Sequence, residues 1–368
     1  MDKINLSDFG FTRLQIETKA ACNMACSFCP YPLKEDKVST LDLNEIKKVI
    51  NQINPKDKNF QFITFSQFNE PLLDNRIFGI VDYAQNLGHK VYFITNGLLL
   101  NKKKNVDELL RLKPDIKISL QIIESSKHYK GRGLNMDLLR YSKTIFDFCE
   151  EAKNKDVNIT IDIGCNFNDN KIKYSLRKFF GIQSGDPSVI NDKEGILKIL
   201  KQFLQELVKI NPNYFDTIDL NEATKKSNFI KSNAHLSDYF TQKTFKIANN
   251  IEIKIKPFFY GRRISEFHPL PSSAFLCKSE ILGILADGSI VPCCLVYDDS
   301  IALGNVKKQN LFQVLEKNEF LKNLRKYDGE KHQVCKKCFG EPTRRGVFFR
   351  TVYNYIKKFS LNSFSQKN

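Results

Sequence analysis

The chain has 368 residues, 42% hydrophobic and 12% aromatic, so it is long enough for a large domain plus a smaller one and too apolar for wholesale disorder. No apolar run approaches the roughly 18 residues that a membrane span needs, and the polar segment 1–14 contains no signal-peptide core. We therefore expect a cytoplasmic protein without a membrane span. The net charge of +16 is spread along the chain, which favours a lysine-rich solvated surface over a nucleic-acid partner.

Short apolar runs rich in β-branched and aromatic residues alternate with amphipathic segments through the first 255 residues. The predicted strands are Leu14–Thr18, Phe60–Phe65, Val91–Thr95, Ile116–Leu120, Ile159–Ile163, Phe215–Leu220 and Ile251–Phe259. The predicted helices include Leu43–Ile53, capped by Asp42, and Asp74–Leu87, closed by Gly88. This alternation predicts parallel strands joined by right-handed crossovers, with ligands bound at the C-terminal ends of the strands.

The alternation is interrupted after Cys165. The mixed-polarity stretch 166–193 is predicted to be an insertion, and Gly195–Ile210 an amphipathic helix. Two prolines in His268–Ser273 predict a linker into a C-terminal domain. The aromatic and basic tail Gly346–Ser360 is expected to dock on the body of the protein, the alternative being a membrane surface.

Three of the ten cysteines follow the first predicted strand, with the spacing Cys22-x3-Cys26-x2-Cys29. In a reducing compartment, grouped cysteines indicate metal or cluster ligands rather than disulfides. Three thiolates at this spacing can hold three corners of a 4Fe–4S cluster and leave the fourth iron open for a chelating small molecule. From spacing alone, a zinc site or three reduced structural cysteines remain alternatives.

The cysteine loop resembles that of the radical S-adenosylmethionine (SAM) superfamily, and further motifs extend the resemblance over residues 14–165. The matching positions are Phe28 before Cys29, Asn69-Glu70-Pro71 after the second strand, Thr95-Asn96-Gly97 after the third, Ser119 on the fourth and Arg132-Gly133 beyond it. The resemblance implies that these residues bind SAM on a cluster held by the three cysteines. One electron from that cluster would cleave SAM to methionine and a 5′-deoxyadenosyl radical.

Each of these positions has a chemical role in the implied site. Glu70 and nearby carbonyls can accept hydrogen bonds from the SAM ammonium group. Arg132 can pair with the SAM carboxylate, and Ser119 can bond a ribose hydroxyl. A plain turn at Asn96-Gly97 and a buried, satisfied Ser119 are the alternatives.

The sequence departs from the family at two positions that are usually glycine, Gln67 and Asn69. Asn tolerates positive φ better than most residues, so Asn69 is a mild change. Gln67, in contrast, is expected to add a side chain beside the cofactor or substrate pocket.

A second cysteine group has the pattern Cys277-x10-Gly288-x4-Cys293, followed by Cys335-x2-Cys338. Four thiolates can hold a complete 4Fe–4S cluster or a zinc ion. The pattern resembles the auxiliary-cluster domains known as SPASM and Twitch, as do Leu303–Val306 and the helix-like Leu311–Leu324. No cysteine follows Cys338, so the resemblance implies a Twitch-like or shortened SPASM domain with one auxiliary cluster. Cys294 is interpreted as a small buried residue; the alternative is that Cys294 is itself a cluster ligand.

Two further cysteines stand alone. Cys165 lies on the face of Ile163 if the alternation of the fifth strand continues. A thiol at that rim can return a hydrogen atom to a substrate radical, as epimerases of this type do; the alternative is an inert buried cysteine. Cys149, in a helical run, is expected to be a packing residue.

These observations predict an α/β fold with three parts. A partial (β/α)6-type barrel spans 1–265, a small α+β cysteine domain of SPASM or Twitch type spans 266–345, and a helical tail spans 346–368. The expected function is oxidation by radical SAM chemistry, with the auxiliary 4Fe–4S cluster as electron acceptor and a flavodoxin or ferredoxin as electron donor. The resemblance makes a peptide or a small sugar or aminocyclitol the expected substrate. The first strand begins at Leu14, which mildly disfavours a peptide because no leader-binding module precedes the barrel.

Three other functions fit part of the pattern. An epimerase would use Cys165 as hydrogen donor and would incorporate solvent deuterium into its product. An RNA-modifying radical SAM enzyme would show salt-dependent RNA binding. A zinc-stabilised binding protein, which is not an enzyme, would contain zinc without iron.

Overall fold

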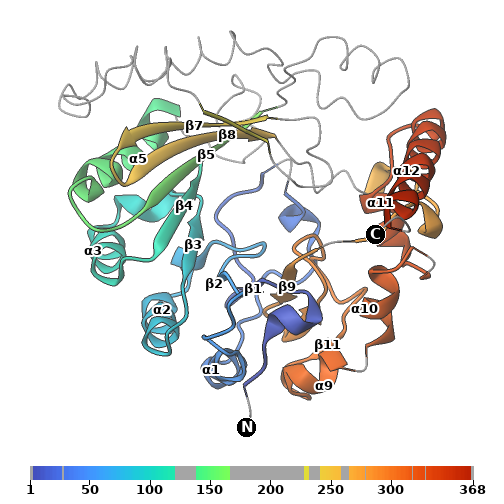
Figure 1. Ribbon diagram of the computed structural model, residues 1–368. Coiled ribbons are helices and arrows are strands. Elements are labelled where there is room, and N and C mark those ends of the chain that lie inside the picture. The colour runs from blue at the N-terminus through green and yellow to red at the C-terminus, as the bar shows by residue number, and fades with distance from the viewer. Residues whose placement is uncertain are drawn as a thin grey trace.

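The computed structural model describes residues 3–26, 29–120, 138–165, 228–231, 241–257, 265–277, 279–316, 318–327 and 329–365. Its parallel strands are β1 (Arg13–Ile16), β2 (Phe62–Thr64), β3 (Tyr92–Thr95), β4 (Asp115–Ser119), β5 (Ile159–Cys165) and β8 (Ile251–Pro257). Neighbours in this order pair in parallel, with β2 and β3 joined by a bridge between Ile63 and Val91. The predicted partial barrel is therefore confirmed, and the strands curve without closing (Figure 1).

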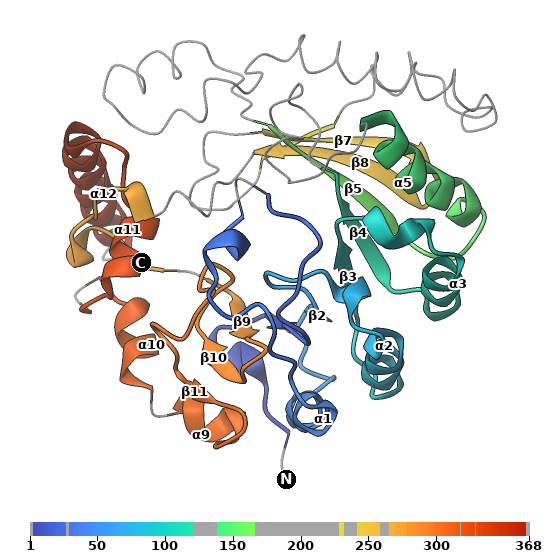
Figure 2. The same ribbon diagram turned by 180° about the vertical axis from the view of Figure 1, so that it is seen from behind.

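Helices cover the outer face of this curved sheet (Figures 1 and 2). They are α1 (Leu43–Gln52), α2 (Ile77–Asn86), α3 (Lys103–Leu112) and α5 (Leu138–Ala152). The Asp42 side chain caps α1 by accepting the Asn44 N–H at 2.7 Å, as predicted. Short 3-10 helices occupy Leu6–Phe9, Tyr31–Leu33, Pro71–Leu73, Leu98–Asn101 and Ser272–Ala274.

The sheet extends further at both edges. At one edge β7 (Thr241–Ala248) pairs antiparallel with β8, and β6 (Asn228–Lys231) pairs with β7; neither was predicted. At the other edge β9 (Ile281–Ile284) pairs in parallel with β1, followed by β10 (Ser289–Val291) and β11 (Gly304–Asn305). The C-terminal hairpin is thus hydrogen-bonded into the sheet that contains β1. The predicted insertion 166–193, helix Gly195–Ile210 and strand Phe215–Leu220 lie outside the described residues.

The C-terminal part continues with α9 (Leu311–Glu316), α10 (Glu319–Leu324), α11 (Gln333–Cys338) and α12 (Arg344–Ser365). The single helix predicted over 311–324 is divided because the Asn318 side chain accepts the Leu321 N–H at 3.1 Å and starts α10. The tail helix contacts the rest of the chain through a Ser273–Tyr355 hydroxyl pair at 2.6 Å. No helix in the described part of the chain is long and apolar enough to cross a membrane.

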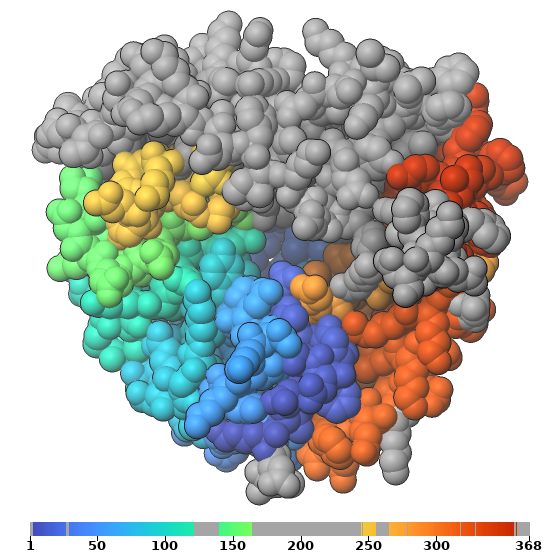
Figure 3. Space-filling model, viewed as in Figure 1, coloured from blue at the N-terminus to red at the C-terminus, as the bar shows by residue number. Residues whose placement is uncertain are grey.

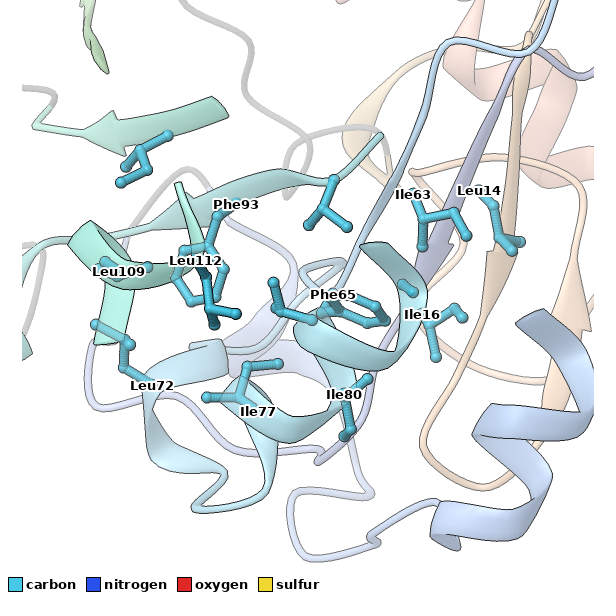
Figure 4. Packing of buried hydrophobic residues seen from close by; sticks show 14 of the residues in the cluster. Leu14, Ile16, Ile63, Phe65, Leu72, Ile77, Ile80, Phe93, Leu109 and Leu112 are labelled. Atoms are coloured by element: carbon cyan, nitrogen blue, oxygen red, sulfur yellow. The ribbon is translucent and has the colours of Figure 1, made fainter. Parts of the chain in front are cut away.

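The main core lies between the strands and the outer helices (Figure 4). Leu14 and Ile16 of β1, Ile63 of β2 and Phe93 of β3 all point into it and are at most 1% exposed. Each such side chain contributes about 1.5–3 kcal/mol through burial. Because strand side chains alternate between faces, the residues between them face the inside of the barrel.

Candidate functional site

The C-terminal ends of the parallel strands meet at one edge of the sheet, where ligands bind in folds of this type. The loop after β1 carries Cys22, Cys26 and Cys29, and the loop after β2 carries Asn69, Glu70 and Pro71. Thr95 is the last residue of β3 and Asn96 follows it, and Ser119 is the last residue of β4. The fold therefore brings these predicted segments to the same edge. Phe28 and Arg132 lie outside the described residues.

Tyr31 closes the cysteine loop on itself. Its hydroxyl accepts the Cys22 N–H at 3.0 Å, and its own N–H donates to Cys29 Sγ at 3.4 Å. Burial, together with the charges of Glu70, Cys26 and Cys29, raises the pKa of the Cys22 thiol to about 12. Thiolates in such a position need a bound cationic group, which fits a cluster held by these three cysteines.

The ligand assignments themselves remain predictions. Within the described ranges, no three His, Cys, Asp or Glu side chains are gathered closely enough to hold a single metal ion. The cysteines of both groups in this part of the chain are free thiols.

Glu70 is 2% exposed and connects the loops after β1, β2 and β3. Its carboxylate accepts the Thr95 hydroxyl at 2.8 Å, the Asn96 N–H at 2.8 Å and the Leu72 N–H at 3.1 Å. Its own N–H donates to the Ala21 carbonyl at 2.8 Å. Burial raises the pKa of the carboxyl and these hydrogen bonds offset part of the rise, so the pKa is about 7. The role that this geometry supports for Glu70 is to position the loops, in addition to the predicted contact with a ligand ammonium group.

Asn96 links the end of β3 directly to the cysteine loop. Its side-chain amide donates to Asn23 Oδ1 at 2.8 Å, and its Oδ1 accepts the Leu98 N–H at 2.9 Å. The turn at Asn96-Gly97 is therefore present, and it also holds the residue that follows Cys22. Tyr141 of α5 donates its hydroxyl hydrogen to the Asn96 carbonyl from the outer layer.

The two departures from the family's glycines have structural explanations. Among the described non-glycine residues only Lys113 has positive φ, so the reasoning that Asn69 replaces glycine by adopting positive φ was wrong. Asn69 instead closes a turn: its Oδ1 accepts the Gln67 N–H at 3.0 Å, and its amide donates to the Phe65 carbonyl at 3.2 Å.

Gln67 points toward the C-terminal hairpin. Its amide donates to the Val296 carbonyl at 2.9 Å, three residues after Cys293. Gly283 of β9 makes room for it, because a Cβ there would lie 2.4 Å from Gln67 Oε1. The next residue, Phe68, makes an edge-to-face contact with Tyr297 at 6.2 Å between ring centroids. The loop after β2 is thus in contact with the segment that follows the second cysteine group.

A buried ion pair that the sequence did not predict encloses the cysteine loop. Glu17, directly after β1, pairs with Lys34, directly after the 3-10 helix that follows the cysteines; their side chains are 0% and 4% exposed. Glu17 Oε2 also accepts the Ala286 N–H of the C-terminal hairpin at 3.0 Å. Burial raises the pKa of the Glu17 carboxyl, and the Lys34 ammonium opposes that shift.

The inner wall of the barrel is polar on β4, β5 and β8. Lys117 pairs with Asp162 at 2.8 Å, and the Thr160 hydroxyl donates to Glu252 at 3.0 Å. Lys254 also pairs with Glu252. The surface is hollowed near the centre of the face in Figure 3, between the cyan residues and the orange C-terminal residues. A wall with charges of both signs is suited to a polar substrate.

The second cysteine group comes together from three segments. Cys277 precedes β9, Cys293 follows β10, and Cys335 and Cys338 lie on α11; Cys293 and Cys335 pack against the same small apolar cluster. Burial, together with the charge of the nearby Cys277, raises the pKa of Cys335 to about 12. The same two causes raise the pKa values of Cys293 and Cys338.

The sequence left two interpretations for each of Cys294 and Cys165. Cys294 lies within electrostatic reach of Cys277 and Cys338, so it belongs to the second group in space as well as in sequence. Cys165 is the last residue of β5, opposite Pro257 of β8. Cys149 is 4% exposed inside α5, as expected for a packing residue.

Comparison with protein families gives two matches. Residues 16–179 match the radical SAM superfamily, and residues 277–339 match SPASM, an iron–sulfur cluster-binding domain. A search of curated proteins found no match.

Solved structures with a similar arrangement include three radical SAM-related proteins. They are BtrN with AdoMet and 2-DOIA (TM-score 0.44, 13% identity, covering 91% of this chain and 93% of that one), anSMEcpe with AdoMet (0.46, 14%, 96% and 95%) and Streptococcus suis SuiB (0.45, 14%, 87% and 70%). At these scores and identities the likenesses carry no information about the reaction.

The match to the radical SAM superfamily over residues 16–179 indicates an iron–sulfur enzyme. The chain belongs to the radical SAM superfamily and carries a SPASM-type iron–sulfur domain. Its cofactors are 4Fe–4S clusters and SAM.

Proposed function

We propose that the protein is an oxidoreductase that abstracts a hydrogen atom from its substrate and passes the remaining electron to an auxiliary 4Fe–4S cluster. The bound cluster and SAM supply the 5′-deoxyadenosyl radical. The substrate radical then loses one electron to the auxiliary cluster and one proton to a base or to solvent, which leaves a product with two fewer hydrogen atoms.

The observation that carries this proposal is the contact between the two cysteine-bearing regions. Gln67 and Phe68, on the loop after β2, meet Val296 and Tyr297, which follow Cys293. Glu17 connects the base of the first cysteine loop to Ala286 in the same hairpin. Both connections favour a shared reaction space over two independent metal sites.

We propose Cys22, Cys26 and Cys29 as ligands of the SAM-binding cluster, and Cys277, Cys293, Cys335 and Cys338 as ligands of the auxiliary cluster. Phe28, Asn69, Glu70, Pro71, Thr95, Asn96, Ser119 and Arg132 are proposed to contact or position SAM. The charged inner wall, with Lys117 and Asp162, supports a polar substrate: a small sugar or aminocyclitol, or a peptide with polar groups. A flavodoxin or ferredoxin of the cytoplasm is the proposed electron donor.

Cys335→Ala is expected to retain SAM cleavage and to lose the oxidised product, because the first cysteine loop is untouched. The reconstituted enzyme is incubated with SAM, dithionite and pooled polar metabolites and peptides. Chromatography measures 5′-deoxyadenosine, and mass spectrometry identifies products lacking two hydrogen atoms. The control, Cys149→Ala, should retain both.

The epimerase alternative gives a different result. Its product has the mass of the substrate and gains one deuterium in heavy water, and Cys165→Ala abolishes or diverts it. If such a product is retained in Cys335→Ala and lost in Cys165→Ala, the auxiliary cluster is not the electron acceptor and Cys165 donates the hydrogen atom instead.

A further inference from the structure

Arg325, the residue directly after α10, extends its side chain to the N-terminal segment of the chain. One guanidinium nitrogen, Nη2, donates to the Gly10 carbonyl at 3.1 Å and to the Ser279 carbonyl at 3.2 Å. The guanidinium carbon also lies 4.9 Å from the ring centroid of Phe11, which is fully buried. These contacts fix the planar group on three sides, and a guanidinium stays charged at any physiological pH.

Gly10 leaves the space that this arrangement needs. A Cβ at this position would lie 2.4 Å from Arg325 Nη1, and the φ of +76° favours glycine in any case. The N-terminal 3-10 helix Leu6–Phe9 thus ends in a turn that receives the guanidinium.

Arg325 and its neighbour hold Cys277, a proposed ligand of the auxiliary cluster, from both sides. The carbonyl of Leu324 accepts the Cys277 N–H at 3.0 Å. The carbonyl that Arg325 binds belongs to Ser279, whose N–H donates to Cys277 Sγ at 3.4 Å. Burial raises the pKa of the Cys277 thiol, and the positive charges of Arg325 and Lys331 oppose that shift.

Glu280, an acidic group within electrostatic reach of Arg325, is hydrogen-bonded to other residues. Glu280 accepts a hydrogen bond from Arg13 at 2.9 Å and one from the Thr12 hydroxyl at 3.3 Å. The two hydrogen bonds of Arg325 given above end on carbonyl oxygens, which orient the guanidinium without cancelling its charge.

We propose that Arg325 raises the reduction potential of the auxiliary cluster and fixes Cys277 in place to bind it. A cluster held by four thiolates becomes more negative when it accepts an electron, so a fixed cation nearby stabilises the reduced form. This inference rests on the proposed function, in which the auxiliary cluster is reduced as the substrate radical is oxidised.

The test is a redox titration of the reconstituted full-length enzyme, followed by electron paramagnetic resonance. Arg325→Met should make reduction of the auxiliary cluster about tenfold less favourable, a fall of about 59 mV for a one-electron couple. Arg325→Lys should restore part of the loss. Gly10→Ala, which keeps the charge but displaces the guanidinium, should shift the potential in the same direction. The control is Lys322→Met, which removes a half-exposed cation from the same helix; it should change nothing.

The possible failures are distinguishable. A wild-type enzyme with about four irons per chain has no auxiliary cluster, and the proposed function then fails together with the inference. If the enzyme holds about eight irons per chain and the auxiliary cluster has the same potential in wild type, Arg325→Met and Gly10→Ala, the inference is wrong but the proposed function is not affected. If Arg325→Met loses the auxiliary iron, the potential of the auxiliary cluster is compared between Gly10→Ala and the wild type. A lowered potential in Gly10→Ala supports the inference, and an unchanged potential rejects it.

Discussion

Replacing Cys22, Cys26 and Cys29 together by alanine is expected to abolish SAM cleavage and to reduce the iron content from about eight to about four per chain. The three cysteines share one loop that Tyr31 closes, whereas the second group is assembled from β9, β10 and α11 segments. Removal of the first set therefore leaves the ligands of the second intact. Iron and sulfide analysis after anaerobic reconstitution, with chromatography of 5′-deoxyadenosine, measures both effects.

Cys149→Ala is the matched control, because this cysteine is buried in α5 and belongs to neither group. It should keep about eight irons and normal cleavage. SAM cleavage that persists in the triple variant would place the radical site elsewhere. Zinc without iron in the wild-type protein would contradict the cofactor assignment and favour the non-enzymatic alternative.

The strands of the barrel could be predicted because each is a short run of β-branched and aromatic residues with buried alternate positions. Leu14–Thr18 and Ile116–Leu120, for example, differ from β1 and β4 by two residues or fewer at either end. The start of α2 was predicted three residues too early. Asp74 lies before that helix, where its carboxylate accepts the Arg76 N–H at 3.0 Å and binds the Arg76 side chain at 2.8 and 2.9 Å.

The pairing of β9 with β1 could not be predicted in this way. Ile281–Ile284 was not among the predicted strands, and its partner begins at Arg13, far away in the sequence. Nothing in either segment alone specifies that contact, which depends on the complete sheet. The same limit explains why the hydrogen bond from Gln67 to the Val296 carbonyl was not predicted; its expected place beside the cofactor or substrate pocket stays a prediction.

The site was predictable where ligand spacing carries the signal, as in the two cysteine groups. It was less predictable where a side chain positions other parts of the protein instead of binding a ligand directly. Glu70 was expected to accept from a ligand, and the structure adds three protein donors to its carboxylate. Glu17 and Lys34 have no motif; an acidic residue at the end of a buried strand was the single available sign.

Lys34→Met is expected to lower the free energy of unfolding by about 3–5 kcal/mol, because it leaves the Glu17 carboxylate buried without its cation. The other carboxylate oxygen, Oε1, is already buried without a hydrogen-bond partner among the described residues, so the site has no spare donor. The double variant Glu17→Gln/Lys34→Met should recover most of the loss. It removes the charge, and the amide oxygen can still accept the Ala286 N–H.

Urea unfolding of the reconstituted protein, followed by circular dichroism, measures the stability of these variants, and 5′-deoxyadenosine formation measures the state of the cysteine loop. Lys34→Met should lose both stability and cleavage, because the pair joins the two ends of that loop. Lys58→Met, at an exposed position, controls for the loss of one positive charge and should match the wild type. A single Lys34→Met variant as stable as the wild type would show that Glu17 is neutral in the folded protein. A double variant as unstable as the single one would show that the packing of Lys34, and not its charge, holds the loop.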